Sequence, residues 1–159
     1  MKPLLRIGLV LSLLAGVLAG CASTGGQRVS EPAASIQQLR IDAHGQWAIE
    51  LRLQNYSSVA MRFDTVDLAL NVGGESAGQL QATPALTVAP ESAEILNLSL
   101  TPSLSAKLQA ADALASGRGL AYRLEGMVNA SPENGKSRSY AIGRDSVLSP
   151  APGLPGVLR

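Results

Sequence analysis

Few residues in this chain of 159 have side chains that commonly do chemistry, since it contains one cysteine, Cys21, and one histidine, His44. A disulfide needs a second cysteine, and a structural zinc site ordinarily needs four cysteine or histidine ligands. One cysteine and one histidine can form neither a disulfide nor such a zinc site. We therefore predict no metal site and no cofactor, and Cys21 needs another explanation.

The sequence supports no catalytic arrangement. A serine–histidine–aspartate relay would have to use His44, which follows Asp42 in the segment DAHGQW, and the chain has no Gly-x-Ser-x-Gly elbow. The segment GGESAG lacks the lysine and the hydroxyl residue of a phosphate-binding loop. We interpret His44 as a solvent-exposed turn residue and predict that the protein is not an enzyme.

The residues before Cys21 account for the cysteine. Lys2 and Arg6 give a positively charged start, residues 7–17 (IGLVLSLLAGV) are almost entirely apolar, and small residues lead into Cys21. This order is typical of a secretory signal peptide. Because a membrane-spanning helix requires roughly twenty apolar residues, we predict a signal peptide over residues 1–20 and not a transmembrane anchor.

Leu18, Ala19, Gly20 and Cys21 resemble the lipobox of bacterial lipoproteins. The resemblance implies that the thiol of Cys21 is acylated, that the signal is cleaved just before it, and that the new amino group is acylated too. Two or more acyl chains hold a protein stably on a membrane, whereas one holds it marginally. By the same resemblance Ala22, in place of an aspartate, implies sorting to the outer membrane, facing the periplasm. The alternative is an ordinary signal peptide that ends near a free thiol.

The charge balance argues against nucleic acid as a partner. Without Lys2 and Arg6, the 13 basic residues fall to 11 against 12 acidic ones, and aromatic residues make up 3% of the chain. Such a chain offers no basic surface for a phosphate backbone and no stacking platform for bases. We predict no nucleic-acid partner.

Beyond residue 35 the dominant pattern is a period-two alternation of apolar and polar residues, which is typical of strands buried on one side. It begins with WAIELRLQN, in which we interpret Trp47 as a core anchor. Weaker strands are predicted at residues 36–41 and 76–81, and PALTV (84–88) is expected at a sheet edge. The clear alternation occupies residues 47–54, 63–72, 93–101 and 120–128.

Turn and helix signals separate these strands. Gly73–Gly74 predicts a tight hairpin, and Asn134–Gly135 predicts a reversal into a last strand, SRSYAIG. One helix is predicted over residues 102–116, with Thr101 as N-cap, Pro102 in its first position and Gly117 past its end. Its apolar residues at helical spacing are Leu104, Leu108, Ala111 and Ala115.

These patterns predict an all-β fold, an antiparallel β-sandwich of about seven strands with one short helical connection. We expect the signal peptide at residues 1–20, a lipidated N-terminus and flexible tether at 21–35, and the sandwich at 36–148. A Pro/Gly-rich tail that is not a strand should follow at 149–159. A tether of about fourteen residues would reach on the order of 20 Å.

The stretch LRLQNYSSVAMRFDTVDLALNVGGESAG resembles the late-embryogenesis-abundant type 2 proteins, the desiccation-related or WHy (water stress and hypersensitive response) domain. Their pattern is an alternating strand, an Asn-Pro-Asn turn, a second alternating strand and a glycine-bearing hairpin. Asn55 matches the first Asn, whereas Tyr56 and Ser57 replace the Pro and the second Asn. The resemblance covers residues 36–142 and implies a fibronectin type III-like sandwich without known catalytic residues, associated with protection during water stress.

Two hypotheses from different classes follow. The first is a protective, chaperone-like module, anchored to the membrane through its acyl chains, that shields envelope proteins or lipids when water is withdrawn. The second is an envelope interaction module or accessory subunit that binds a protein partner or a small apolar ligand. A uniformly polar surface favours the first, and an exposed hydrophobic patch or an open sheet edge favours the second.

Overall fold

The computed structural model describes residues 26–159, so the predicted signal peptide, the lipobox and Cys21 lie outside the described residues. Within 26–159 the chain forms nine strands and one helix. These elements are β1 (Ala33–Ile41), β2 (Trp47–Gln54), β3 (Met61–Val72), β4 (Glu75–Ala82), β5 (Leu86–Val88), β6 (Ala93–Leu100), α2 (Leu104–Ser116), β7 (Leu120–Pro132), β8 (Arg138–Leu148) and β9 (Val157–Leu158). The predicted β-rich pattern with one helix is confirmed.

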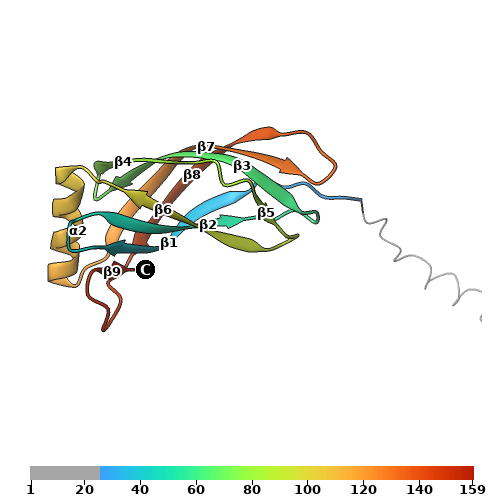
Figure 1. The fold of residues 1–159 in the computed structure, drawn as a ribbon. Coiled ribbons are helices and arrows are strands. Elements are labelled where there is room, and N and C mark those ends of the chain that lie inside the picture. Colours follow the sequence, from blue (N-terminus) through green and yellow to red (C-terminus); the bar gives the residue numbers. More distant parts are fainter. Residues whose placement is uncertain (1–25) are drawn as a thin grey trace, which may run out of the picture.

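The strands form two antiparallel sheets that face each other. One has the order β6-β2-β1-β9, and the other has the order β4-β3-β7-β8 with β5 paired to β3. At the flanks β1 lies near β8, and β4 lies near β6. Helix α2 covers one end of the sandwich, and the described chain begins at the opposite end (Figure 1). The antiparallel β-sandwich is thus confirmed, with nine strands where about seven were predicted.

Alternation along the strands builds the core, because every second side chain of a half-buried strand points inward. In β2 Trp47, Ile49, Leu51 and Leu53 are each at most 1% exposed. In β3 Phe63, Leu68, Leu70 and Val72 are fully buried and face them from the second sheet. Each such side chain contributes about 1.5–3 kcal/mol by leaving water. The prediction that Trp47 is a core anchor is confirmed.

The structure of strand β1 explains why the alternation of apolar and polar residues in its sequence is weak. A bulge lies between Ile36, which pairs with Leu51, and Gln38, which pairs with Glu50. The extra residue lets Ile36 and Leu39 both face the core although they are three positions apart, at 5% and 0% exposure. A bulge shifts the phase of the alternation by one residue, so a strict period-two search detects this strand poorly.

Both predicted reversals are confirmed. Gly73 and Gly74 join β3 to β4 and have φ values of 56° and 85°. Two successive residues with positive φ are what a two-residue hairpin turn of this twist requires, and glycine adopts them without strain. Asn134, between β7 and β8, has φ 62°, a conformation that asparagine tolerates better than most residues.

The helix differs from its prediction in its start and in its buried face. Ser103, not Thr101, is the N-cap, and its Oγ accepts a hydrogen bond from Ala106 N at 3.2 Å. The residues packed against the sheets are Ala106, Ala110 and Ala113, whereas Leu104 is 74% exposed and Leu108 is 63% exposed. Alanine occurs on both faces of this helix, and the face with the smaller side chains packs against the ends of β4, β3 and β7.

The two termini of the described chain are more ordered than predicted. Val157 and Leu158 form β9, which pairs with Arg40 and Leu39 of β1, so the prediction that the tail contains no strand was wrong. Strand β1 begins at Ala33, so the end of the predicted flexible tether at 21–35 is a strand. Within residues 26–159, no helix is long and apolar enough to span a membrane.

Candidate functional site

The family turn motif lies in the loop that joins β2 to β3, residues 55–60, which we call the Asn55 loop. Asn55 is fully buried, and its Oδ1 accepts a hydrogen bond from Ser57 N at 2.8 Å. Its backbone N–H donates to Ser92 O at 2.9 Å. The side-chain Nδ2 donates to three carbonyl oxygens, those of Val59 at 2.8 Å, Ala89 at 3.0 Å and Val88 at 3.2 Å. One side chain therefore joins its own loop to the connection between β5 and β6.

The second buried residue of the motif, Ser57, holds the chain that leads into β1. Its Oγ accepts a hydrogen bond from Ser30 N at 3.0 Å and donates to Ser30 O at 3.3 Å. The neighbouring Ser58 exchanges bonds with Arg28, since Ser58 N donates to Arg28 O at 2.9 Å and Arg28 N donates to Ser58 Oγ at 2.8 Å. We call residues 28–30 the incoming segment.

Arg28 adds a charged contact to this set. Its Nη2 donates to Tyr56 O at 3.0 Å and to the Glu91 carboxylate at 2.9 Å. Both charged side chains are more than half exposed, so the ion pair itself contributes little stability. Its effect is geometric, because it joins the incoming segment, the Asn55 loop and the 89–92 turn at one end of the sandwich.

The three residues of the motif thus have different environments. Asn55 and Ser57 are buried and hydrogen bonded within the fold, whereas Tyr56 between them is 51% exposed. The structure brings the first and third residues together and directs the second to solvent. Because the Asn55 nitrogen is fully buried and donates to the protein, the N-x-S pattern at 55–57 is not an accessible glycosylation site in the folded chain.

His44 lies in the exposed turn between β1 and β2, as predicted. Asp42 Oδ1 accepts hydrogen bonds from His44 N at 2.8 Å and Gln46 N at 2.9 Å. The backbone hydrogen bond from Gln46, with those from His44 and Gly45, lowers the pKa of Asp42. Asp42 therefore stabilises a turn. In residues 26–159 no group of three or more histidine, cysteine or acidic residues is placed to hold a metal ion.

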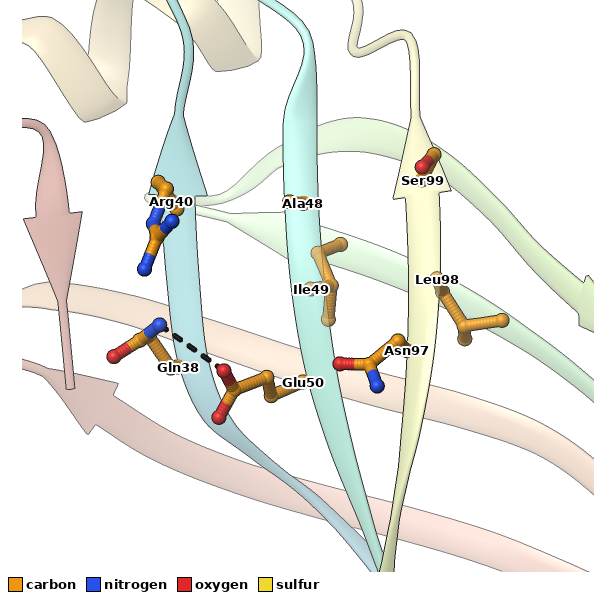
Figure 2. A pocket seen from close by; sticks show the side chains of 8 residues that line it. All are labelled: Gln38, Arg40, Ala48, Ile49, Glu50, Asn97, Leu98 and Ser99. Carbon is orange, nitrogen blue, oxygen red and sulfur yellow. Dashed lines mark hydrogen bonds between the residues drawn. The ribbon is translucent and has the colours of Figure 1, made fainter.

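The outer face of the four-stranded sheet carries a polar concavity of about 250 Å³. Gln38 is 6% exposed at its floor, where it donates to Glu50 Oε1 at 3.2 Å and accepts from Arg159 Nε at 2.8 Å. Figure 2 shows Gln38 and Arg40 of β1, Glu50 of β2 and Asn97 of β6 displayed across three adjacent strands. The bulge in β1 places Gln38 here, a position that the alternation of the sequence did not predict.

The outer face of the second sheet is mostly polar, although it also exposes Met127 and Val147, at 42% and 56%. Asp67 accepts hydrogen bonds from Gln79 at 2.6 Å and from Gln81 at 3.2 Å, and these two bonds lower its pKa. Arg123 contacts Glu125 at 2.6 Å and Asp145 at 3.0 Å, which raises the pKa of Arg123. The hydrogen bond and the charge of Arg123 lower the pKa of Glu125. Both sheets therefore present amide and charged groups to solvent on a rigid framework.

A different surface lies on α2. Leu104 and Leu108, which the sequence pattern placed in the core, instead project from the exposed side of the helix. Beside them a mostly apolar groove separates α2 from the loop before β9, where Leu154 is 45% exposed. We call this the α2 apolar surface. Its other groove residues are Ala111, Leu114, Ala115, Pro150, Ala151, Gly153, Pro155 and Gly156.

These features define a class of protein, a two-sheet antiparallel sandwich with mostly polar outer faces. The polar residues described above either stabilise the fold through hydrogen bonds or lie exposed on those faces. Residues 50–137 match the family described as "Late embryogenesis abundant protein" (LEA_2). This match covers more than half of the chain, so the chain belongs to that family. The family is associated with water stress and is generally non-enzymatic. The resemblance stated from the Asn55 turn and its flanking strands is confirmed.

Solved structures that are similar to this chain include the following three. A crystal structure of a protein from Archaeoglobus fulgidus is 16% identical, with 77% of this chain and 98% of that chain covered and a TM-score of 0.43. A solution structure of an Arabidopsis thaliana protein is 10% identical, with coverages of 78% and 80% and a TM-score of 0.45. An X-ray structure of a structural-genomics target is 12% identical, with coverages of 79% and 91% and a TM-score of 0.47. No curated protein matches the chain.

Proposed function

We propose that the protein is a non-catalytic lipoprotein whose sandwich protects neighbouring envelope proteins or lipids when water is withdrawn. The observation that carries this proposal is the family match over residues 50–137, which covers β3, β4, β5, β6, α2 and β7 completely. The position of Cys21 after an apolar signal-like segment supports the anchor. The proposed location is the outer membrane, with the domain facing the periplasm.

The polar outer faces supply a physical basis for protection. A polar group that loses its hydration without gaining a new partner costs about 1–3 kcal/mol. Glu50, Asn97 and Asp67 present acceptors and donors from paired strands of the two sheets. Such groups replace some of the hydrogen bonds that a client surface loses with its water. A sandwich that covers a client, meaning a protected envelope protein or lipid, also reduces direct association between one client and another.

The anchor has a direct test. The purified membrane form is digested, and the mass of its N-terminal peptide is compared with that of a Cys21→Ser variant. We expect an acylated peptide that begins at Cys21, and we expect the variant to lose the acyl mass and its membrane association. An unmodified thiol, with the chain recovered in the soluble fraction, would exclude the lipoprotein proposal. Protection itself is measured as enzyme activity retained after drying.

An interaction module is the second candidate, and the α2 apolar surface favours it. Monomeric proteins seldom expose contiguous apolar surface without a use for it, and Leu104 and Leu108 are one turn apart on the same side of α2. The occupant would be an envelope protein with a complementary apolar surface. In crosslinking from the membrane-anchored chain, a single recurrent partner that is lost in the Leu104→Gln, Leu108→Gln double variant supports this function. Equal crosslinking in both forms would contradict it.

A further inference from the structure

The contacts of the incoming segment determine which end of the sandwich lies closest to an anchor at Cys21. We infer that the end formed by the Asn55 loop, the incoming segment and the 89–92 turn rests on the lipid surface, with the Tyr56 side chain in the headgroup region and α2 directed away from the membrane. This inference rests on the proposed anchoring through Cys21. It assigns an orientation to the anchored domain.

Chain length limits the possible orientations. Arg28 is held by Ser58, Tyr56 and Glu91, so the chain is attached to the sandwich from Arg28 onward, before the predicted end of the tether at residue 35. The residues from Cys21 to Arg28 span at most about 25 Å when fully extended. Strand β3, with 12 residues, is about 40 Å long and runs from the Asn55 loop to the Gly73 hairpin beside Gln109 of α2. The tether therefore keeps the Asn55 end within about 25 Å of the membrane, and it is too short for the sandwich to rest on α2 with the Asn55 end outermost.

The contacts also restrict rotation about the point of attachment. Arg28 and Ser58 share three hydrogen bonds, and Ser30 and Ser57 share two more across the same pair of segments. Paired bonds at two successive sites fix the direction of a chain as well as its position. In Figure 1 the described chain enters at the end that carries β5 and the start of β3, opposite α2. The incoming segment therefore joins the sandwich at a fixed place, at the end opposite α2.

The exposed residues at this end suit a lipid surface. Tyr56 is 51% exposed and Val29 is 42% exposed, and the adjoining Ala89 and Pro90 are exposed as well. Tyrosine is favoured at membrane interfaces because its ring is apolar and its hydroxyl remains hydrated. The charges of Arg28 and Glu91 are paired with each other, and the exposed Glu133 and Lys136 of the adjoining β7–β8 turn are opposite in sign. We therefore expect the contact to form on zwitterionic lipids and to need no anionic headgroups.

The test places tryptophan at each end of the anchored chain. Cys21 of the chain from residue 21 onward is coupled to a maleimide-bearing lipid in phosphatidylcholine vesicles whose acyl chains are brominated close to the headgroups. Tyr56→Trp and the matched control Leu108→Trp are compared, with Trp47, 1% exposed, as a common background. We expect several-fold stronger bromine quenching of emission in the Y56W variant than in L108W. Equal quenching in the two variants, or quenching in neither, would overturn the inference.

A second comparison tests the role of the incoming segment. Arg28→Ala with Ser58→Ala, both at exposed positions, is added to each tryptophan variant, and circular dichroism verifies the fold. We expect the difference in quenching to become smaller but not to vanish, because the Ser30–Ser57 bonds and the pairing of Ala33 with Gln54 still attach the chain at this end. An unchanged difference would show that the Arg28–Ser58 contacts do not set the orientation. The coupled lipid replaces the native anchor, so this experiment reports the orientation whether or not cells acylate Cys21. Absence of the native anchor is detected independently, by the mass of the N-terminal peptide.

Discussion

At the residue scale, Asn55 makes the contacts on which the rest of the site depends. Replacement by alanine leaves three carbonyl oxygens and the Ser57 N–H without their partner in a fully buried position. We expect Asn55→Ala to lower the free energy of unfolding by about 2–4 kcal/mol in urea titrations. The neighbouring Tyr56→Ala, at a half-exposed side chain, should cost less than about 1 kcal/mol. Equal losses would show that the hydrogen bonds of Asn55 are not the cause.

Carboxylates on the surface give the protein a defined acid response. Hydrogen bonds lower the pKa values of Asp42 and Asp67 in the folded state, and Arg123 lowers that of Glu125. Their stabilising contribution is therefore complete above the ordinary carboxyl pKa of about 4 and is lost as the pH falls through the lower folded values. Thermal unfolding between about pH 6 and about pH 2 measures it. We expect Asp67→Asn to flatten this dependence, and an unchanged slope would contradict the assignment.

Sequence reasoning located the chemistry of this chain only in part. Asn55 and Ser57 were found because they occupy positions of a family turn, and His44 was correctly interpreted as an exposed turn residue. Gln38 was missed, because a bulge rather than the alternation of the strand brings it to the floor of the polar concavity. The partners of Ser57 and Ser58 were also missed, since Arg28 and Ser30 are almost thirty residues away in an apparently featureless segment.

At the scale of elements, the pairing of β3 with β7 depends on one glycine. Gly126 pairs with Leu68, and a Cβ there would overlap the carbonyl oxygen of Asp67 at a φ of 152°. We expect Gly126→Ala to lower the free energy of unfolding by about 3 kcal/mol or more. Gly143 in the adjacent β8 has open space around it, so Gly143→Ala should be neutral or slightly stabilising. Chemical denaturation compares the two, and similar losses would exclude a steric origin.

Two substitutions test which face of α2 is buried. Ala110 is fully buried against the sheets, so Ala110→Leu overpacks the contact and should cost about 1–3 kcal/mol. Leu108 is 63% exposed, so Leu108→Gln should change the free energy of unfolding by less than about 0.5 kcal/mol. Thermal or urea unfolding of both variants tests the assignment. A larger loss in L108Q would mean that the leucine side of the helix faces the core, as its spacing alone predicted.

Elements with a strong period were predictable, and the others depended on tertiary contacts. The strands at 47–54 and 63–72 followed from alternation alone. The buried face of α2 did not, because alanines support two competing helical stripes and packing against the sheets decides between them. Strand β9 was missed because two residues carry no periodicity, and its existence depends on β1 being available as a partner.

At the scale of the whole molecule, the sandwich has two different ends and two polar outer faces. The Asn55 loop holds the incoming chain at one end, and α2 with its apolar surface lies at the other (Figure 1). With the proposed anchor, the two polar faces extend away from the membrane surface, and the α2 apolar surface lies at the end farthest from it. Protection by the faces and binding through α2 are therefore separable by mutation.

The central claim is protection during water loss, and drying tests it most directly. Residues 22–159 are mixed with a labile enzyme, dried and rehydrated through repeated cycles, and the retained activity is compared with that of equal masses of an inert protein. The L104Q/L108Q double variant is included to separate the polar faces from the α2 apolar surface. Our account predicts retained activity well above the inert control, and equally so for the double variant. Retention no better than the control would contradict it.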